Sequence, residues 1–337
     1  MTVHRRVGRG WLWVPPAIGA ALAGVLLTPV LDPELASQPE PLTNYDDALA
    51  RIDQITAAED GLPLLERGRS IAALTGARTP ISVLIFHGYT NTPDGFRLLA
   101  RGYRDQGYNV WLPRLPHHGL ADKLTDDFSQ LTSTELRGFA DQAVDIAAGL
   151  GEQVLVLGLS GGGALALWAA LERSEVARTV LISPLLNPGG YPSWTVPPMV
   201  RALRLSPVDR YNWWAPEKGA DNVAGMVYPR YSLKGLAAFL GLGVWASGRP
   251  AGSVSGSLLL IRNAGDPSID ADYNEDLIRR LVPADQVEVF GIPASAGLPH
   301  DFVCPDPEFG TDTQVAEGYR QLSAALGIPL PDPLTAR

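Results

Sequence analysis

Ser160 is the residue whose surroundings most clearly indicate chemistry. It lies in the pattern Gly-Leu-Ser-Gly-Gly at 158–162, between an apolar run at 154–157 and an Ala/Leu-rich run at 163–168. This order predicts a strand, a tight turn and a helix, with the serine on the turn. Glycines let strand and helix pass closely, and the first amides of the helix would face whatever the serine attacks. The pattern therefore predicts a nucleophilic serine.

Two other interpretations of this glycine-rich turn fail. A dinucleotide loop needs Gly-x-Gly-x-x-Gly, and no register of this stretch supplies it. A phosphate loop needs lysine before Ser or Thr, but the only lysines are Lys123, Lys218 and Lys234. A chance occurrence of the pattern is the remaining alternative, and the flanking strand and helix argue against it.

A serine hydroxyl becomes a nucleophile when a base takes its proton, and a carboxylate holds that base in one tautomer. His300 is the only histidine after Ser160, so we predict that it is the base. Asp266 lies in a turn just beyond an apolar run at 257–261 and is our preferred carboxylate. The competing carboxylates lie further along the chain or beside the histidine: Asp270, Asp272 and Asp301. An immediate neighbour is poorly placed to orient the ring.

Acyl transfer also needs donors for a developing oxyanion. We expect the amide of Gly161, directly after the serine, and the amide of Tyr89, in the loop after an apolar run at 81–86. His87 is interpreted as structural. For His117 and His118 a polar loop near the site is favoured over metal binding, because no further ligands stand at suitable spacing.

Apolar strands and helical runs alternate along most of the chain. The fold that this order predicts has to bring Ser160, Asp266 and His300 together. Strands apolar on both sides predict an α/β fold with a mostly parallel, doubly wound sheet, whose ligands bind beyond the carboxyl ends of the strands. Strands are expected near 81–86, 108–112, 154–159, 178–182, 257–261 and 287–290. Helices are expected near 45–58, 132–150, 162–173, 232–241, 273–281 and 313–326.

The alternation stops between residues 187 and 255, which we interpret as a cap inserted over the sheet. Residues 60–186 and 256–337 then form the core, and residues 32–59 a linker and an N-terminal helix. The cap contains Trp194, Trp213, Trp214 and Trp245. Packing between cap and core is expected for most of these, and a smaller share could line an apolar acyl pocket.

The first 31 residues resemble a targeting segment. A basic stretch that includes Arg5 and Arg6 precedes an uncharged, largely apolar run from Trp11 to Leu31. The run is long for a cleaved signal, so an uncleaved signal anchor is favoured over a signal peptide. A buried N-terminal arm is the structural alternative. We therefore expect an exported or membrane-anchored chain.

Composition excludes several classes of function. The chain has 337 residues and a net charge of −9, which argues against nucleic acid as a partner. Cys304 is the only cysteine, so there is neither an intrachain disulfide nor a cysteine-based metal site. Nothing in the sequence indicates the oligomeric state.

Taken together, these motifs resemble the bacterial carboxylesterase and monoacylglycerol lipase branch of the alpha/beta-hydrolase superfamily. The matching stretches are His-Gly-Tyr-Thr-Asn-Thr-Pro at 87–93, Pro-His-His-Gly at 116–119 and the turn at 158–162, followed by Asp266 and Leu-Pro-His-Asp at 298–301. The resemblance covers roughly residues 60–330. It implies an alpha/beta-hydrolase fold and a triad of Ser160, Asp266 and His300, while residues 187–255 match no motif of the family. It also implies an oxyanion hole made by the amides of Tyr89 and Gly161.

We therefore expect a serine hydrolase that cleaves carboxylic esters through an acyl-enzyme and needs no metal or organic cofactor. A small-molecule ester, lipophilic if the apolar cap lines its pocket, is the expected partner. The pair His117-His118 departs from the more usual Gly-His-Gly, so substrate preference is not carried over. A thioesterase, acyltransferase or serine peptidase on the same fold stays open. A non-catalytic, membrane-tethered binding protein is the alternative from another class.

Overall fold

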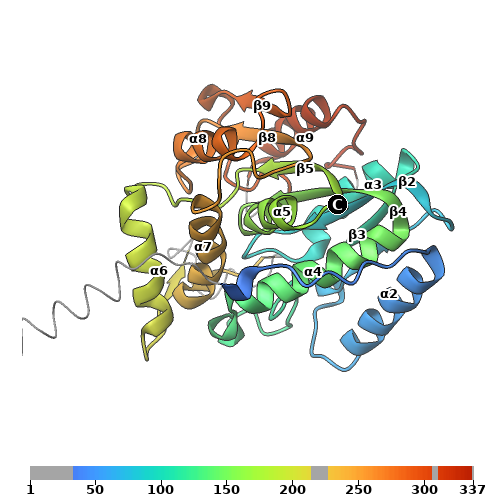
Figure 1. Ribbon diagram of the computed structural model, residues 1–337, viewed down its shortest axis with the longest axis horizontal. Helices are drawn as coiled ribbons and strands as arrows, with labels where there is room; N and C mark the ends of the chain where they lie inside the picture. Colours follow the sequence, from blue (N-terminus) through green and yellow to red (C-terminus); the bar gives the residue numbers. More distant parts are fainter. Residues whose placement is uncertain (1–32, 214–226, 306–309, 336–337) are drawn as a thin grey trace, which may run out of the picture.

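The computed structural model describes residues 33–213, 227–305 and 310–335, and element labels follow Figure 1. Its main sheet has seven strands in the order β1-β3-β2-β4-β5-β8-β9. All neighbours pair in parallel except β1, which is antiparallel to β3. The strands are β1 (Ile71–Ala73), β2 (Thr79–Phe86), β3 (Asn109–Leu112), β4 (Gly151–Leu159), β5 (Val176–Ile182), β8 (Ser257–Asn263) and β9 (Val287–Ile292).

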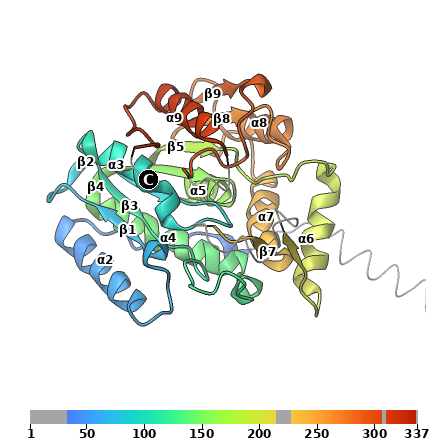
Figure 2. The same cartoon turned by 180° about the vertical axis from the view of Figure 1, so that it is seen from behind.

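Helices cover both faces of this sheet, because the strands present apolar side chains to both sides. One buried cluster joins the sheet to α4 (Ser133–Leu150), α5 (Gly161–Glu172) and α8 (Ala271–Leu281). The other joins it to α3 (Arg97–Asp105) and α9 (Asp312–Leu326), which Figure 2 shows from behind. The predicted α/β fold with a mostly parallel, doubly wound sheet is confirmed.

Between β5 and β8 the regular alternation gives way to a different set of elements. These are α6 (Val196–Leu205), the antiparallel pair β6 (Tyr211–Trp213) and β7 (Arg230–Ser232), and α7 (Leu233–Ser247). Helix α7 packs on α5, while α6 lies on its outer side (Figure 1). Trp245 is buried in the core, but Trp194 is 76% exposed. The packing interpretation of the cap tryptophans is therefore wrong for Trp194, and Trp214 lies outside the described residues.

The targeting interpretation of residues 1–31 also lies outside the described residues and stays a prediction. In the part of the chain that the structure covers, no helix combines the length and the apolar character needed to cross a membrane.

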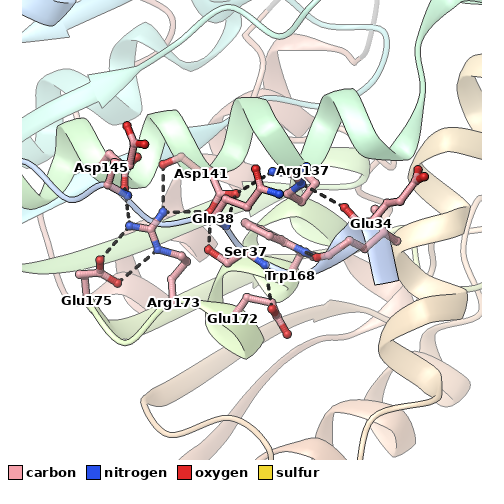
Figure 3. A network of polar contacts seen from close by, with 12 residues as sticks. Glu34, Ser37, Gln38, Arg137, Asp141, Asp145, Trp168, Glu172, Arg173 and Glu175 are labelled. Carbon is pink, nitrogen blue, oxygen red and sulfur yellow. Dashed lines mark hydrogen bonds and ion pairs between the residues drawn. The ribbon is translucent and has the colours of Figure 1, made fainter. Parts of the chain in front are cut away.

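A buried ionic network fastens the segment 34–42 to α4 and α5 (Figure 3). The fully buried guanidinium of Arg173 pairs with Asp145 at 2.6 Å, Glu175 at 2.8 Å and Asp141 at 3.1 Å. Asp141 also accepts hydrogen bonds from the Ser37 hydroxyl and the Gln38 amide. The same carboxylates therefore neutralise Arg173 and hold the chain that leads into α2 (Tyr45–Glu59).

Replacing Arg173 with methionine is expected to lower the free energy of unfolding by about 3–5 kcal/mol, because the substitution leaves buried carboxylates without their counter-charge. Arg279→Met is the matched control, since Arg279 forms an exposed ion pair with Glu275 on α8 and should cost under about 1 kcal/mol. Urea unfolding followed by circular dichroism measures both. Equal losses for the two variants would contradict the structural role of the network.

Candidate active site

Ser160 lies between the end of β4 and the start of α5, in a backbone conformation with φ 54° and ψ −116°. Its amide donates to the carbonyl of Ile182, and its own carbonyl accepts from Ala164 and Leu185. These bonds hold a positive φ that is unusual for a residue with a side chain. The predicted strand, turn and helix are therefore present, with the serine at the carboxyl edge of the sheet.

The two outer glycines of the pattern are required by close backbone approaches. A Cβ on Gly158 would lie 2.1 Å from the carbonyl oxygen of Gly162, and one on Gly162 would lie 2.2 Å from that of Phe86. Neither contact can be relieved by turning a side chain. The spacing of Gly-x-Ser-x-Gly thus follows from how tightly β2, β4 and α5 pack around the turn.

His300 and Asp266 form a close pair. The ring Nδ1 of His300 lies 2.5 Å from Oδ2 of Asp266, whose side chain has no exposed surface. The other oxygen, Oδ1, accepts from the amide of Ser268 at 2.8 Å. Asp266 is therefore fixed by donors on both oxygens, and it holds Nδ1 of the ring.

The charges of this pair reinforce each other. Burial by itself raises the pKa of Asp266, but the hydrogen bond and charge of His300 outweigh it and hold that pKa below its ordinary value. Burial lowers the pKa of His300, yet the bond to Asp266 and the charges of Asp266 and Asp301 raise it overall. The arrangement favours an ionised carboxylate facing a ring that readily accepts a second proton.

The competing carboxylates do not contact this ring. Asp270 caps α8 by accepting from the amide of Tyr273, and Asp272 pairs with Arg262 while 86% exposed. Asp301 bonds elsewhere, to Asn91 and to two backbone amides. The preference for Asp266 as the partner of His300 therefore agrees with the geometry.

Tyr89 lies in the loop after β2, and Gly161 directly follows Ser160. Gly161 is the first residue of α5, so its amide has no acceptor within the helix. Among the described residues, no acceptor is bonded to the amide of Tyr89. The Tyr89 side chain is buried and donates to the carbonyl of Ser232 at 2.9 Å, which connects this loop to the cap.

The site thus combines a strained serine between β4 and α5 with a histidine–aspartate pair that follows β8 and β9. A sequence model described as the alpha/beta hydrolase family matches residues 83–321. The chain belongs to the alpha/beta hydrolase family. The match begins within β2 and ends within α9, and it contains every residue that we assign to the site.

A curated relative of this alpha/beta hydrolase matches only part of the chain. The thermostable monoacylglycerol lipase of Bacillus sp. (strain H-257) is 34% identical over 110 residues, 31% of this chain. The match spans 40% of the length of that relative.

Three solved structures share the fold of this hydrolase. A metagenome-derived lipolytic enzyme has a TM-score of 0.55 at 20% identity and covers 78% of this chain and 99% of its own. The monoacylglycerol lipase of Paleococcus ferrophilus has a TM-score of 0.52 at 19% identity, covering 75% and 98%. A soluble variant of the Saccharomyces cerevisiae monoglyceride lipase has a TM-score of 0.53 at 16% identity, covering 77% and 91%. These likenesses establish the fold alone.

A cavity of about 620 Å³ connects the site of this hydrolase with the cap. Ser160, His300 and Tyr89 line it, so the structure brings three of the predicted residues to one space. Its apolar wall comes largely from the cap and the loop before it: Leu185, Met199, Leu203, Leu233 and Leu236. Of the cap tryptophans that the structure describes, none lines this cavity. The interpretation that some of them line an acyl pocket is therefore wrong for Trp194, Trp213 and Trp245.

The two histidines of the 116–119 loop differ in their contacts. His118 is fully buried, with Nε2 2.5 Å from the carbonyl oxygen of Tyr89 and Nδ1 2.7 Å from that of Pro116. Burial lowers its pKa to about 4, against the opposing effect of the two carbonyls that its ring nitrogens face. His117 instead pairs with Glu135 at 3.2 Å. In the described residues no cluster of histidine, cysteine or carboxylate side chains could hold a metal ion.

His87 has both ring nitrogens engaged with backbone, as its structural interpretation requires. Nδ1 lies 3.0 Å from the carbonyl oxygen of Gly88, and Nε2 accepts from the amide of Leu115 at 3.1 Å. The residues that the sequence pattern did not identify are His118, Asn91 and Asp301 as contacts of the site loops. The sequence contains these polar residues, but each bonds to a partner that is distant in the chain, so no local pattern reveals the contact.

Proposed function

We propose that this chain is a serine hydrolase that cleaves carboxylic esters. The observation that carries the proposal is the 2.5 Å pair between His300 and the buried Asp266, beside a cavity that also contains Ser160 on its strained turn. The proposed nucleophile, orienting carboxylate and base follow one another along the chain in the order that this fold uses.

The proposed reaction begins when the Ser160 hydroxyl oxygen attacks the ester carbonyl carbon while Nε2 of His300 takes the hydroxyl proton. Asp266 keeps the remaining ring proton on Nδ1 and stabilises the imidazolium that forms. The amides of Tyr89 and Gly161 donate to the oxyanion of the tetrahedral intermediate.

The intermediate then collapses into an acyl-enzyme. The bond between the carbonyl carbon and the alkoxy oxygen breaks, and His300 gives its proton to the departing alcohol. Water attacks the acyl-enzyme, with His300 again taking a proton, and the carboxylic acid leaves as Ser160 regains its hydrogen. The same residues thus serve both halves of the reaction.

We further propose that the acyl group is lipophilic. The apolar wall formed by Met199, Leu203 and Leu236 supports this, because each methylene transferred from water into such a wall gains about 0.8 kcal/mol, roughly a fourfold effect. The Bacillus relative is a monoacylglycerol lipase, which agrees with this substrate class.

A series of p-nitrophenyl esters tests the proposal. We expect kcat/KM to rise at least tenfold from acetate to octanoate, and Leu236→Asn to flatten that rise because it makes the cavity wall polar. Leu205→Asn is the matched control, because Leu205 lies on the same cap but is 67% exposed. No preference beyond acetate would remove the lipophilic substrate.

Parallel thioester and peptide substrates separate esterase from thioesterase and peptidase, and an added alcohol acceptor reveals acyl transfer. Faster turnover of a thioester than of the matched ester would redirect the assignment. A purified protein that turns over none of these substrates would favour the non-catalytic binding protein.

A further inference from the structure

Asp301 is a buried carboxylate that the proposed triad does not use. It follows His300 directly, but its oxygens bond away from the ring. Oδ1 accepts from the amides of Val303 at 3.0 Å and Cys304 at 2.9 Å, and Oδ2 accepts from Nδ2 of Asn91 at 2.7 Å. The side chain is 4% exposed. Burial raises the pKa of the Asp301 carboxyl, and the hydrogen bonds from Cys304, Asn91 and Val303 act against that rise and hold its ionised form in a single orientation.

Asn91 connects this carboxylate to the loop that carries Tyr89. The backbone amide of Asn91 donates to the carbonyl of Gly88 at 3.1 Å and closes a turn over residues 88–91. Its side-chain oxygen lies so close to Gly88 that a Cβ there would be 2.4 Å away. The buried carboxamide therefore packs against Gly88, the residue whose carbonyl carbon is bonded to the Tyr89 nitrogen.

We propose that the Asn91–Asp301 hydrogen bond is a positioning bridge between the oxyanion loop, 88–91, and the histidine loop, 298–303. The two residues are 210 positions apart in sequence, and both line the cavity that contains Ser160. The loops reach Ser160 from opposite sides of β4, since β2 precedes one of them and β9 precedes the other. This inference rests on the proposed esterase function.

The bridge matters because catalysis depends on the mutual placement of the two loops. An oxyanion donor must lie within about 2.7–3.1 Å of the developing charge, and a misplacement of about 1 Å can cost roughly a hundredfold in rate. His118 and the amide of Tyr228 hold the Tyr89–Thr90 segment through its carbonyls. Asn91 is the contact that joins this loop to the residue next to the base.

Asp301 also acts on His300 through its charge. The acidic groups that raise the pKa of His300 are Asp266 and Asp301. Removing the Asp301 charge therefore lowers that pKa, and the acidic limb of kcat/KM against pH should move to lower pH. Asn91→Ala keeps the carboxylate and should not move the limb downward. The pH profile thus separates loss of charge from loss of the bridge.

The test exchanges the two side chains. Asn91→Asp alone sets two carboxylates against each other and should lower kcat for p-nitrophenyl butyrate at least a hundredfold. The double variant Asn91→Asp/Asp301→Asn restores a donor and acceptor, because the amide at 301 can accept from Val303 and Cys304 and donate to the carboxylate at 91. We expect its kcat to recover to within about tenfold of wild type, with KM nearly unchanged throughout.

Three further variants complete the design. Asn91→Ala is the milder probe and should lower kcat by about ten- to a hundredfold, whether or not Asn91→Asp folds. Asp301→Asn alone should show the downward pH shift. Asp285→Asn is the matched control, because Asp285 is exposed and precedes β9 at the opposite edge of the sheet. Rates are normalised to folded active sites by fluorophosphonate titration and circular dichroism.

The wild type and Ser160→Ala are measured first, so failure of the proposed function is seen there and independently of the bridge. With an active wild type, full kcat in Asn91→Ala would overturn the bridge. An exchange variant that is folded but no faster than Asn91→Asp would overturn it as well. Recovery on exchange, together with the pH shift in Asp301→Asn, supports it.

Discussion

Replacing Ser160 with alanine is expected to lower kcat/KM for a p-nitrophenyl ester by about four to six orders of magnitude. The hydroxyl oxygen is the proposed nucleophile, and loss of a catalytic serine in a triad has effects of this size. The backbone bonds of Ser160 to Ile182, Ala164 and Leu185 do not involve the hydroxyl. The variant should therefore keep the circular dichroism spectrum of the wild type and a similar melting temperature.

Ser255→Ala is the matched control for that experiment. Ser255 is exposed and precedes β8 at the edge of the sheet away from the site, so its loss should leave kcat/KM within about twofold of wild type. Folded Ser160→Ala protein with more than a hundredth of the wild-type activity would mean that another group attacks the ester.

Replacing Asp266 with asparagine is expected to lower kcat about ten-thousand-fold while leaving the fold intact. Oδ1 accepts from the amide of Ser268, so the new amide nitrogen takes the place of Oδ2 and donates to Nδ1 of His300. The ring proton then sits on Nε2, which can no longer accept the proton of Ser160. The loss comes from the wrong tautomer and not from a moved side chain.

Asp270→Asn and Asp272→Asn are the controls, because these carboxylates were the competitors in the sequence. Asparagine at 270 still caps α8, and Asp272 is exposed, so both variants should stay within about threefold of wild-type kcat. Steady-state kinetics near pH 8 measures all three. An Asp266→Asn enzyme with a tenth of the wild-type kcat would exclude Asp266 as the orienting carboxylate.

The fold was predictable, and candidates for the centre of the site could be chosen, because both depend on patterns that are local in the chain. The alternation of apolar strands with helices predicts a parallel sheet, and the glycines around Ser160 are required by contacts between adjacent elements. Asp266 was proposed from its place just beyond an apolar strand, and His300 by elimination. Each of these inferences needs only a short stretch of sequence and the general order of the fold.

The remaining contacts depend on side chains that meet from distant parts of the chain. Asn91 and Asp301 bond across 210 positions, and His118 meets the carbonyl of Tyr89 across 29. The sequence argued against Asp301 as the orienting group, but contained no indication of the hydrogen bond that it forms with Asn91. In the cap, the exposure of Trp194 follows from tertiary packing, which composition does not reveal.

Covalent labelling tests the central claim most directly. The full chain is treated with a fluorophosphonate, digested, and mapped by mass spectrometry, beside Ser160→Ala treated in the same way. We predict one adduct on the wild type, located on Ser160, and none on the variant. An adduct on another residue, or undiminished labelling of Ser160→Ala, would contradict the assignment of Ser160 as the nucleophile.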